Sequence, residues 1–522
     1  MHLGRMMIGA ALVAALGLYG CASTIGSNGT EGNTGGAHAG GGGAATHTTS
    51  TTGQTSTTGQ GGAGACASMP KPHSDAGVPP DLIPGTSSTV GAGGGPFNPG
   101  AATWGVAFGD DYEHTLTSAA TAPNGDVLLT GTFGSAVDFG GGALQAKNGS
   151  IFLARLDTTG HHVFSMQFGG EASGEARAAS DVMGNLYLGG YLGPGKVDLG
   201  GGTTDSATGN AFLMRLDAAG HHVWSRRFSA PCLGGYSNIL GVAVAPSTGD
   251  VVVAGSFQGQ FSLGDEVLTS SSPAGDRFLA SFDATGMLRW KKVFHKSNIG
   301  LGFSVAVDAH GDIAVAGPFE DPLSFGGPTL TSLGGDDIFV VKLDADGNHL
   351  WSRQFGTPAQ DFGGSVTIGP SGELLVTAEV QDALDLGKGP IPGAPGERHV
   401  LFAVFESNGD LRFSTDVDAL VPDPGFVFVS GSGFDAAGNV TVSLQLTETY
   451  PNAVIAKLSA SGDLVWLKPF DEEGRTMGSG AIARPNGGIV VVAVQNPVAM
   501  DVDGVHFPAP NERALMVVDL AP

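Results

Sequence analysis

The strongest constraint on the fold of this chain is a sequence unit that recurs seven times between Trp104 and the C-terminus. One copy, residues 338–356, reads IFVVKLDADGNHLWSRQFG: an apolar strand, an Asp-x-x-Gly turn, a second strand opened by an aromatic residue, and then Phe-Gly. A regular period above about fifty residues is typical of repeat architectures. The aromatic residues of the seven copies are Trp104, Phe164, Trp224, Trp290, Trp351, Phe413 and Trp466.

Each unit also contains a hairpin and a strongly apolar middle strand. The hairpin turns, such as Pro123-Asn124-Gly125-Asp126, place Gly where a positive φ is needed. The strands that follow, such as DVVVAGSF at 250–257, are apolar almost without alternation, so both of their faces must be covered. Four antiparallel strands per unit, repeated seven times and covered on both faces, predict an all-β, seven-bladed β-propeller.

The two ends of the repeat region predict how the ring closes. The chain finishes on ALMVVDL at 514–520, a third strand with no fourth strand after it. Residues 104–108 form a fourth strand with no third strand before it. Pairing these two segments completes the seventh blade and leaves no open sheet edge.

The repeat carries a family resemblance. The pattern Trp-x-x-x-Phe-Gly, followed by Asp-x-x-Gly-Asn-hydrophobic-Tyr-hydrophobic-x-Gly as at Asp181 to Gly190, resembles the SBBP (seven-bladed β-propeller) repeat of bacterial surface and secreted proteins. The resemblance covers residues 104–522 and implies a surface or interaction module, in a family whose molecular role is largely unassigned. The sixth copy departs from the pattern because it lacks most of the connection between its second and third strands.

Residues 1–20 have the features of a signal peptide. A short polar start precedes an apolar run from Met6 to Tyr19, which is short for a membrane span and suits a signal sequence. The segment Leu18-Tyr19-Gly20-Cys21 resembles the bacterial lipobox, which implies a lipoprotein with a palmitate-containing anchor on Cys21. Ala22 then implies sorting to the outer membrane, on its periplasmic or cell-surface face. An ordinary secretory peptide and an uncleaved anchor are the alternatives.

Residues 21–99 are rich in Gly, Ser, Thr and Ala and predict a flexible tether between the anchor and a propeller at 100–522. Cys66 lies in this tether and Cys232 lies in the propeller. In an oxidising compartment these two cysteines are candidates for a disulfide, and two free thiols are the alternative.

Charge and motifs narrow the function classes. The formal net charge of −25 repels nucleic acid and anionic lipid, so the predicted contact with a membrane runs through the N-terminal lipid only. Gly-x-Ser-x-Gly, P-loop, His-Glu-x-x-His and Cys-x-x-Cys motifs are absent from the sequence. This favours a binding role over catalysis and predicts no cofactor.

Two repeated features could hold a metal ion. Asp157, Asp217, Asp283 and Asp344 open equivalent turns, and calcium is the cation that such carboxylates would bind. The alternative is that each Asp only shapes its own turn. The pairs His161-His162 and His221-His222 suggest zinc or copper. Adjacent residues on a strand point to opposite faces, which favours exposed, duplicated histidines instead.

The loops that follow the fourth strands are acidic and should border the mouth of the central channel. We call these residues the acidic collar; converging carboxylates there would attract calcium or a basic peptide, and solvated loop charge is the alternative. The predicted function is an envelope-anchored binding or scaffold module for a protein or glycan, and the alternative is an extracellular hydrolase or lyase at the acidic channel mouth. The collar comprises Asp110, Asp111, Glu113, Glu171, Glu175, Asp361, Asp416, Asp418, Asp423, Asp471, Glu472 and Glu473.

Overall fold

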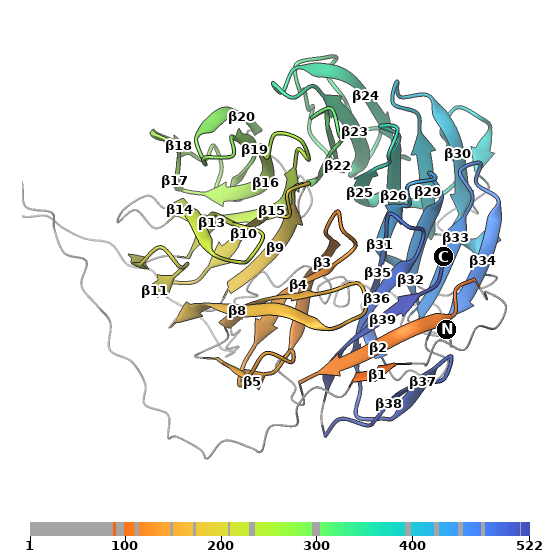
Figure 1. Ribbon diagram of the computed structural model, residues 1–522. Helices are drawn as coiled ribbons and strands as arrows, with labels where there is room; N and C mark the ends of the chain where they lie inside the picture. Colours follow the sequence, from red (N-terminus) through yellow and green to blue (C-terminus); the bar gives the residue numbers. More distant parts are fainter. Residues whose placement is uncertain are drawn as a thin grey trace, which may run out of the picture. The chain divides into compact units, whose positions relative to one another are not determined.

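The chain folds into seven four-stranded antiparallel blades arranged in a ring (Figure 1), as the repeat predicts. All of the described residues belong to one compact unit, and helix among them is limited to the short 3₁₀ turn η2 (Val417–Ala419). The computed structural model describes residues 87–89, 99–109, 114–146, 150–170, 174–206, 209–228, 235–294, 303–391, 398–421, 427–446, 453–470, 476–511 and 513–522.

Each blade runs from an innermost first strand to an outermost fourth strand. The strands are, in blade I, β3 (Thr115–Thr121), β4 (Val127–Phe133), β7 (Ser150–Leu156) and β8 (His162–Gly170); in blade II, β9 (Gly174–Ser180), β10 (Leu186–Leu192), β13 (Asn210–Leu216) and β14 (His222–Phe228); in blade III, β15 (Tyr236–Val244), β16 (Val251–Gln258), β19 (Asp276–Phe282) and β20 (Leu288–Phe294); in blade IV, β21 (Ser304–Val307), β22 (Ile313–Phe319), β23 (Asp337–Leu343) and β24 (His349–Phe355); in blade V, β25 (Phe362–Ile368), β26 (Leu374–Gln381), β29 (Arg398–Phe405) and β30 (Leu411–Asp416); in blade VI, β31 (Val427–Phe434), β32 (Val440–Leu446), β33 (Ala453–Leu458) and β34 (Leu464–Pro469); and in blade VII, β35 (Thr476–Ala483), β36 (Ile489–Gln495), β39 (Ala514–Leu520) and β2 (Ala102–Phe108).

The hydrophobic core lies between consecutive blades. The first strands contact one another all the way round the ring, and the second and third strands are buried on both faces. One core cluster, for example, joins Val404 of blade V to Val442 of blade VI. The doubly covered middle strands that the sequence predicts are therefore confirmed.

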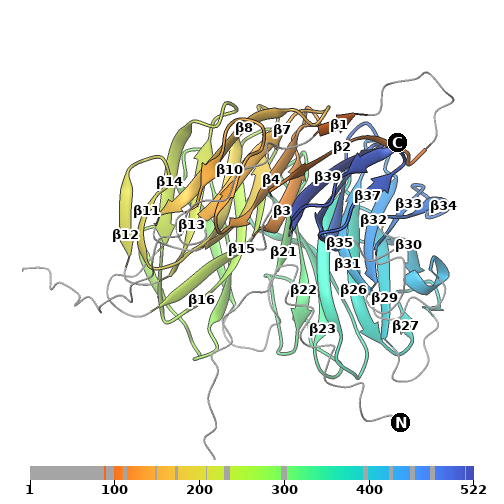
Figure 2. The same cartoon turned by 90° about the horizontal axis from the view of Figure 1, so that it is seen from below.

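Ring closure also follows the prediction. Strand β2 pairs with β39, with Trp104 opposite Asp519, and Figure 2 shows the two strands side by side. The backbone N–H of Gly100 donates to the carbonyl of Ala521 at 3.1 Å, which joins the two segments at the end of the blade. Strand β1 (Ser87–Thr89), inside the predicted tether, pairs with the outer edge of β2.

Short hairpins in the connections between second and third strands fill the space where neighbouring blades diverge. In blade I, Phe139 of this connection lies 5.0 Å from the rings of both Phe108 and Phe152 and is buried. The Phe139-Gly140 segment of this connection therefore supplies packing between blades. The hairpins are β5 (Ala136–Val137) with β6 (Leu144–Gln145), β11 (Gly195–Asp198) with β12 (Thr203–Ser206), β17 (Gln260–Leu263) with β18 (Glu266–Thr269), β27 (Leu384–Asp385) with β28 (Pro390–Ile391), and β37 (Met500–Val502) with β38 (Val505–Phe507).

A β-bulge precedes the aromatic residue of every fourth strand. In blade I the register shifts between Arg155 and Leu156, which leaves Val163 as the extra residue before Phe164. The fourth strands thus begin two residues before the aromatic residue, earlier than the repeat pattern indicates. A bulge twists its strand and re-aims the side chains beside it. The same shift occurs in all seven blades.

The bulge directs the aromatic ring onto the turn glycine of the next blade. The Trp224 Nε1–H donates to the carbonyl of Ala284 at 2.9 Å, and a Cβ on Gly286 would lie 2.9 Å from the Trp224 ring. We call this arrangement the aromatic–glycine contact. It joins Trp104 to Gly160, Phe164 to Gly220, Trp224 to Gly286, Trp290 to Gly347, Trp351 to Gly409, Phe413 to Gly462 and Trp466 to Gly100.

A pair of glycine substitutions tests this contact. Gly286 and Gly504 have similar positive φ values, 81° and 86°, but no atom lies within 4 Å of a Cβ placed on Gly504. Gly504→Ala should cost about 1 kcal/mol from backbone strain alone. Gly286→Ala should cost about 2 to 4 kcal/mol, because the Trp224 ring must also move. Denaturant unfolding of both variants measures the difference, and equal losses would contradict this role for the contact.

Candidate functional site

The ends of the blades form two different faces. The turn face carries the turns between strands one and two and between strands three and four. Gly184 from the first kind of turn and Ala218 from the second lie together there, with Ala218 Cβ 3.3 Å from a Cβ placed on Gly184. The loop face carries the connections between strands two and three and the links to the next blade.

The Asp residues of the turn face shape their own turns. Asp217 Oδ1 accepts the backbone N–H groups of Ala219 at 2.9 Å and His221 at 2.8 Å. Asp157, Asp283 and Asp344 make the same two bonds in their turns. In the described part of the chain, no group of three or more His, Cys, Asp or Glu side chains is placed to hold a metal ion.

The paired histidines have separate partners. His161 Nδ1 lies 2.7 Å from Thr159 Oγ1, while His162 Nε2 lies 3.0 Å from Ser165 Oγ. Burial lowers the pKa of His162, against the opposing charge of Asp138. The His–Ser pair recurs as His222 with Ser225 and as His349 with Ser352.

Two described members of the acidic collar are held by neighbouring side chains. Glu175 Oε1 accepts from Asn238 Nδ2 at 2.7 Å and lies 3.8 Å from Arg177 Nη1. Asp416 Oδ2 lies 3.2 Å from the buried His399 Nδ1. Asp418 belongs to η2. Other predicted sites lie outside the described residues: Asp110, Asp111, Glu113, Glu171, Asp423, Asp471, Glu472 and Glu473 of the collar, and Cys21, Cys66 and Cys232.

Asp361, the remaining described member, is completely buried beside a second carboxyl. Asp361 Oδ2 accepts the Thr357 N–H at 2.7 Å, and Oδ1 accepts the Gln381 N–H at 2.9 Å. The Oδ1 of Asp337 and the Oδ2 of Asp361 both lie within 2.8 Å of the position that a Cβ on Gly356 would take. Burial raises the pKa of Asp337 and of Asp361, and the charge of Asp361 raises that of Asp337 further.

An ion pair lies on the same face of blade V. Arg398 Nη1 lies 2.6 Å from Glu379 Oε1, and its guanidinium lies 4.8 Å from the centre of the Phe362 ring. Burial raises the pKa of Glu379, and the attraction of Arg398 works in the opposite direction. Glu175, Glu379, Asp361 and Asp416 are therefore buried or paired within the protein.

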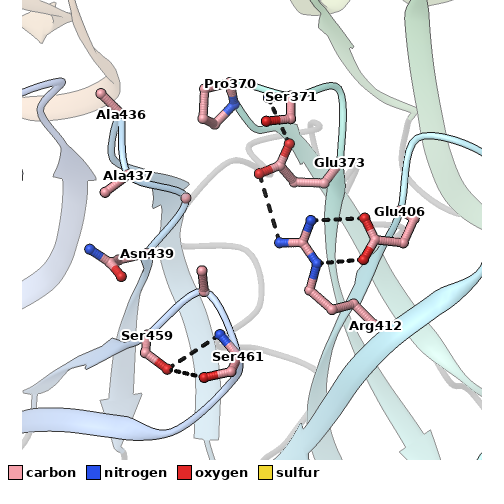
Figure 3. Close-up of a pocket in the computed structure, with 12 residues that line it drawn as sticks. Pro370, Ser371, Glu373, Glu406, Arg412, Ala436, Ala437, Asn439, Ser459 and Ser461 are labelled. Atoms are coloured by element: carbon pink, nitrogen blue, oxygen red, sulfur yellow. Dashed lines mark hydrogen bonds and ion pairs between the residues drawn. The ribbon is translucent and has the colours of Figure 1, made fainter.

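A pocket of about 750 Å³ opens on the turn face between blades V and VI (Figure 3). Arg412 crosses one wall and holds Glu406 through two hydrogen bonds of 2.8 Å, from Nε and Nη2. These bonds lower the pKa of Glu406 and raise that of Arg412. The lining residues are Pro370, Ser371, Glu373, Glu406, Arg412, Ala436, Ala437, Gly438, Asn439, Ser459, Ala460 and Ser461.

Sequence reasoning missed this pocket, although the sequence holds a signal for it. The turn that begins with Asp in blades I to IV begins with Glu406 in blade V and Ser459 in blade VI. In blade V the backbone N–H of Asp410 donates to Asn408 Oδ1 and not to the first residue of the turn. The Glu406 carboxylate can therefore reach Arg412. Ser459 Oγ accepts the N–H groups of its own turn without bringing a negative charge.

Comparison with known proteins finds a partial match to one curated protein and matches to solved structures at low sequence identity. No family model matches the chain. The regulatory protein FlaEY of Caulobacter vibrioides is 26% identical over 240 residues, which span 43% of this chain and 24% of that protein. This chain thus matches about a quarter of the length of that relative.

Solved structures match this chain at low TM-score and low sequence identity. The Neurospora crassa Pan2 WD40 domain has a TM-score of 0.41 and 9% identity, covering 79% of this chain and 95% of that one. The propeller domain of the Pyrococcus furiosus Trilobed protease has a TM-score of 0.39 and 10% identity, over 78% and 96%. Polysaccharide lyase Uly1 has a TM-score of 0.41 and 10% identity, over 77% and 89%. A shared fold does not carry an activity from one chain to another.

The Asp337–Asp361 pair predicts a pH dependence of stability. Because the pKa of Asp337 is above its ordinary value of 3.8 in the folded state, its stabilising effect is complete below that value and is lost as pH rises through the folded pKa. Asp337→Asn should therefore reduce the loss of unfolding free energy between about pH 4 and 7, by on the order of 1 kcal/mol.

Asp344→Asn is the control with the opposite sign. Partial burial works against ionisation of Asp344, but hydrogen bonds from Asn348 and Asp346 leave its pKa lowered. This variant should lose stability at neutral pH and approach the parent protein as the pH falls through the lowered pKa. Denaturant unfolding from pH 7 down to below the ordinary Asp pKa of 3.8 measures both variants, and an unchanged slope for Asp337→Asn would contradict the prediction.

Proposed function

We propose that this protein is an envelope-anchored binding or scaffold module that presents the loop face of its propeller to a protein or glycan partner. The supporting observation is the contrast between the two faces. Asp157, Asp217, Asp283 and Asp344 form the same turn in successive blades, whereas the links on the loop face differ in length and sequence. One link joins Gly170 to Gly174, and another joins Asp416 to Val427.

A rigid scaffold with variable loops is a common arrangement for recognition. The aromatic–glycine contacts fix the blades, and the differing links lie at one end of that fixed frame. The pairing of Glu175 with Asn238 also favours a preformed surface, because this acid is held in place before any ligand arrives.

The envelope location rests on the N-terminal sequence. A lipid on Cys21 would attach the chain to the outer membrane, and residues 22–99 would hold the propeller away from the bilayer. The SBBP-like repeat favours the same surface role. Among the described residues, no helix has the length and apolar content that crossing a bilayer requires.

Site-specific photo-crosslinking in intact cells tests the proposed face. A crosslinker in place of Tyr236 or Leu333, which are exposed on the loop face of blades III and IV, should capture the same partner from both positions. A crosslinker at Met183 or Val163, exposed towards the turn face, is the matched control and should not capture it. Equal capture from both faces, or different products at the two loop-face positions, would contradict this proposal.

Substitution of Cys21 tests the anchor separately. Cys21→Ser should abolish incorporation of a palmitate analogue and move the protein from the membrane fraction to the soluble fraction, because a lipid chain supplies the membrane affinity. Cys66→Ser is the control and should change neither result. Retention of Cys21→Ser in the membrane fraction would instead support an uncleaved apolar segment as the anchor.

A further inference from the structure

The blades are joined at the turn face by cationic side chains that reach towards the next blade. In blade I, Arg155 pairs with Asp126 of its own blade through Nε at 2.8 Å, and its Nη1 donates to the carbonyl of Ala218 in blade II at 3.0 Å. Arg155 lies directly opposite the aromatic residue of its blade, Phe164. Arg215, Lys342 and Lys457 occupy the same position in blades II, IV and VI.

Blades III and V place this cation on a different strand. The position opposite the aromatic residue holds Ser281 in blade III and Val404 in blade V, and an arginine occupies the bulge instead. In blade III this arginine, Arg289, pairs with Asp250 of its own blade, and its Nη2 donates to Asp346 of blade IV at 3.0 Å. The junction between blades III and IV is thus closed by an ion pair.

The junction between blades V and VI lacks an ion pair from the bulge arginine to the next blade. Arg412 turns back onto Glu406 of its own blade, and blade VI has Ser461 where blade IV has Asp346. Among the described residues, no side-chain hydrogen bond joins blade V to blade VI at the turn face. The pocket in Figure 3 occupies the space between them.

Within the pocket, an unused donor faces a buried acceptor. Arg412 Nη1 lies 3.8 Å from Glu373 Oε1, which is too long for a hydrogen bond, and Nη1 makes no other hydrogen bond in the described part of the chain. The side chain of Glu373 is only 3% exposed. A ligand hydroxyl to one side of the two atoms, within hydrogen-bond distance of both, could accept from Nη1 and donate to Oε1. Ser461 Oγ donates to Asp463 Oδ2 at 2.7 Å and Asn439 Nδ2 donates to Asp435 Oδ2 at 2.9 Å, so these two lining side chains offer the pocket mainly their acceptor oxygens.

The charges of the pocket select against ionic ligands. Two carboxylates line it against one guanidinium, in a chain of net charge −25, so an anion is disfavoured. A cation gains little, because Arg412 already lies between Glu373 and Glu406. We propose that the pocket between blades V and VI binds a neutral, hydroxyl-rich ligand, such as a sugar unit. This site is independent of the loop face.

Titration of the full chain with neutral sugars tests the proposal. Neutral mono- and oligosaccharides, with oligogalacturonate and oligoarginine as charged probes, are titrated by calorimetry up to about 10 mM, which reaches weak single-site affinities. The neutral probes should bind and the charged probes should not. Equal binding of monomers and oligomers would identify a free sugar as the ligand, and binding of oligomers alone would identify a glycan.

Ser461→Asp is the decisive variant. It places at the junction between blades V and VI the carboxylate that Asp346 supplies at the junction between blades III and IV. It should weaken binding roughly tenfold or more, the effect of losing one hydrogen bond to a charged group, while the unfolding midpoint is kept or raised. Arg412→Lys keeps the charge, removes the Nη1 donor and should weaken binding similarly. Thr269→Asp adds the same charge on an exposed hairpin and should leave binding unchanged.

Three results would overturn the proposal. The first is that no neutral sugar binds the parent protein, and the second is that a charged probe binds in preference to the neutral ones. The third is that neutral sugars bind equally well to Ser461→Asp, to Arg412→Lys and to the parent protein, which would place any sugar site elsewhere.

Discussion

The aromatic–glycine contact is the interaction on which the rest of the structure depends. A ring of separate sheets is stable only if each sheet is held at a fixed angle to the next. The bulge before each aromatic residue points the aromatic side chain at the neighbouring blade, which holds that angle. The turn glycine gives the ring a flat surface, and in four blades the indole N–H also donates to a carbonyl of that turn, as Trp351 does to Ser407. At the closure of the ring, Gly100 takes the place of the turn glycine beneath Trp466. The same contact therefore operates where the chain itself is not continuous.

The cations of the turn face show how this frame tolerates sequence change. Removing one partner of a buried ion pair is costly, because the remaining charge would be buried without a partner. Where Ser281 and Val404 replace the cation of strand three, an arginine at the bulge forms the ion pair of the blade instead. Blade VII reverses the polarity, with Arg484 on the turn and Asp519 on the strand, 3.3 Å apart. The sequence varies while six of the seven blades keep an ion pair for this cation, and Arg215 of blade II instead lies over the Tyr187 ring, 5.6 Å from its centroid.

The sequence predicts the parts of this structure that depend on local pattern. Spacing and apolar runs are enough for seven blades, the strand order and the closure by β2, since each follows from one unit and its copies. The pairs Asp337 with Asp361 and Arg412 with Glu373 depend on which side chains the ring brings together, and spacing along the chain does not encode that. The bulge was also missed, because an inserted residue such as Val163 looks like any other strand residue. Departures from the repeat, such as Glu406 and Ser459, were the usable signal.

At the junction between blades V and VI, polar side chains are available to a ligand because apolar packing holds the two blades together. Val404 lies in the apolar cluster shared by the two blades, and the Phe413 ring still packs on Gly462, so the core keeps its contacts without a crossing cation. Burial of apolar surface holds these blades together. The polar groups at the rim are consequently released from a structural role. Because Glu406 secures Arg412 within blade V, the guanidinium stays oriented towards the pocket without any support from blade VI. Stability and recognition thus rest on different atoms of the same junction.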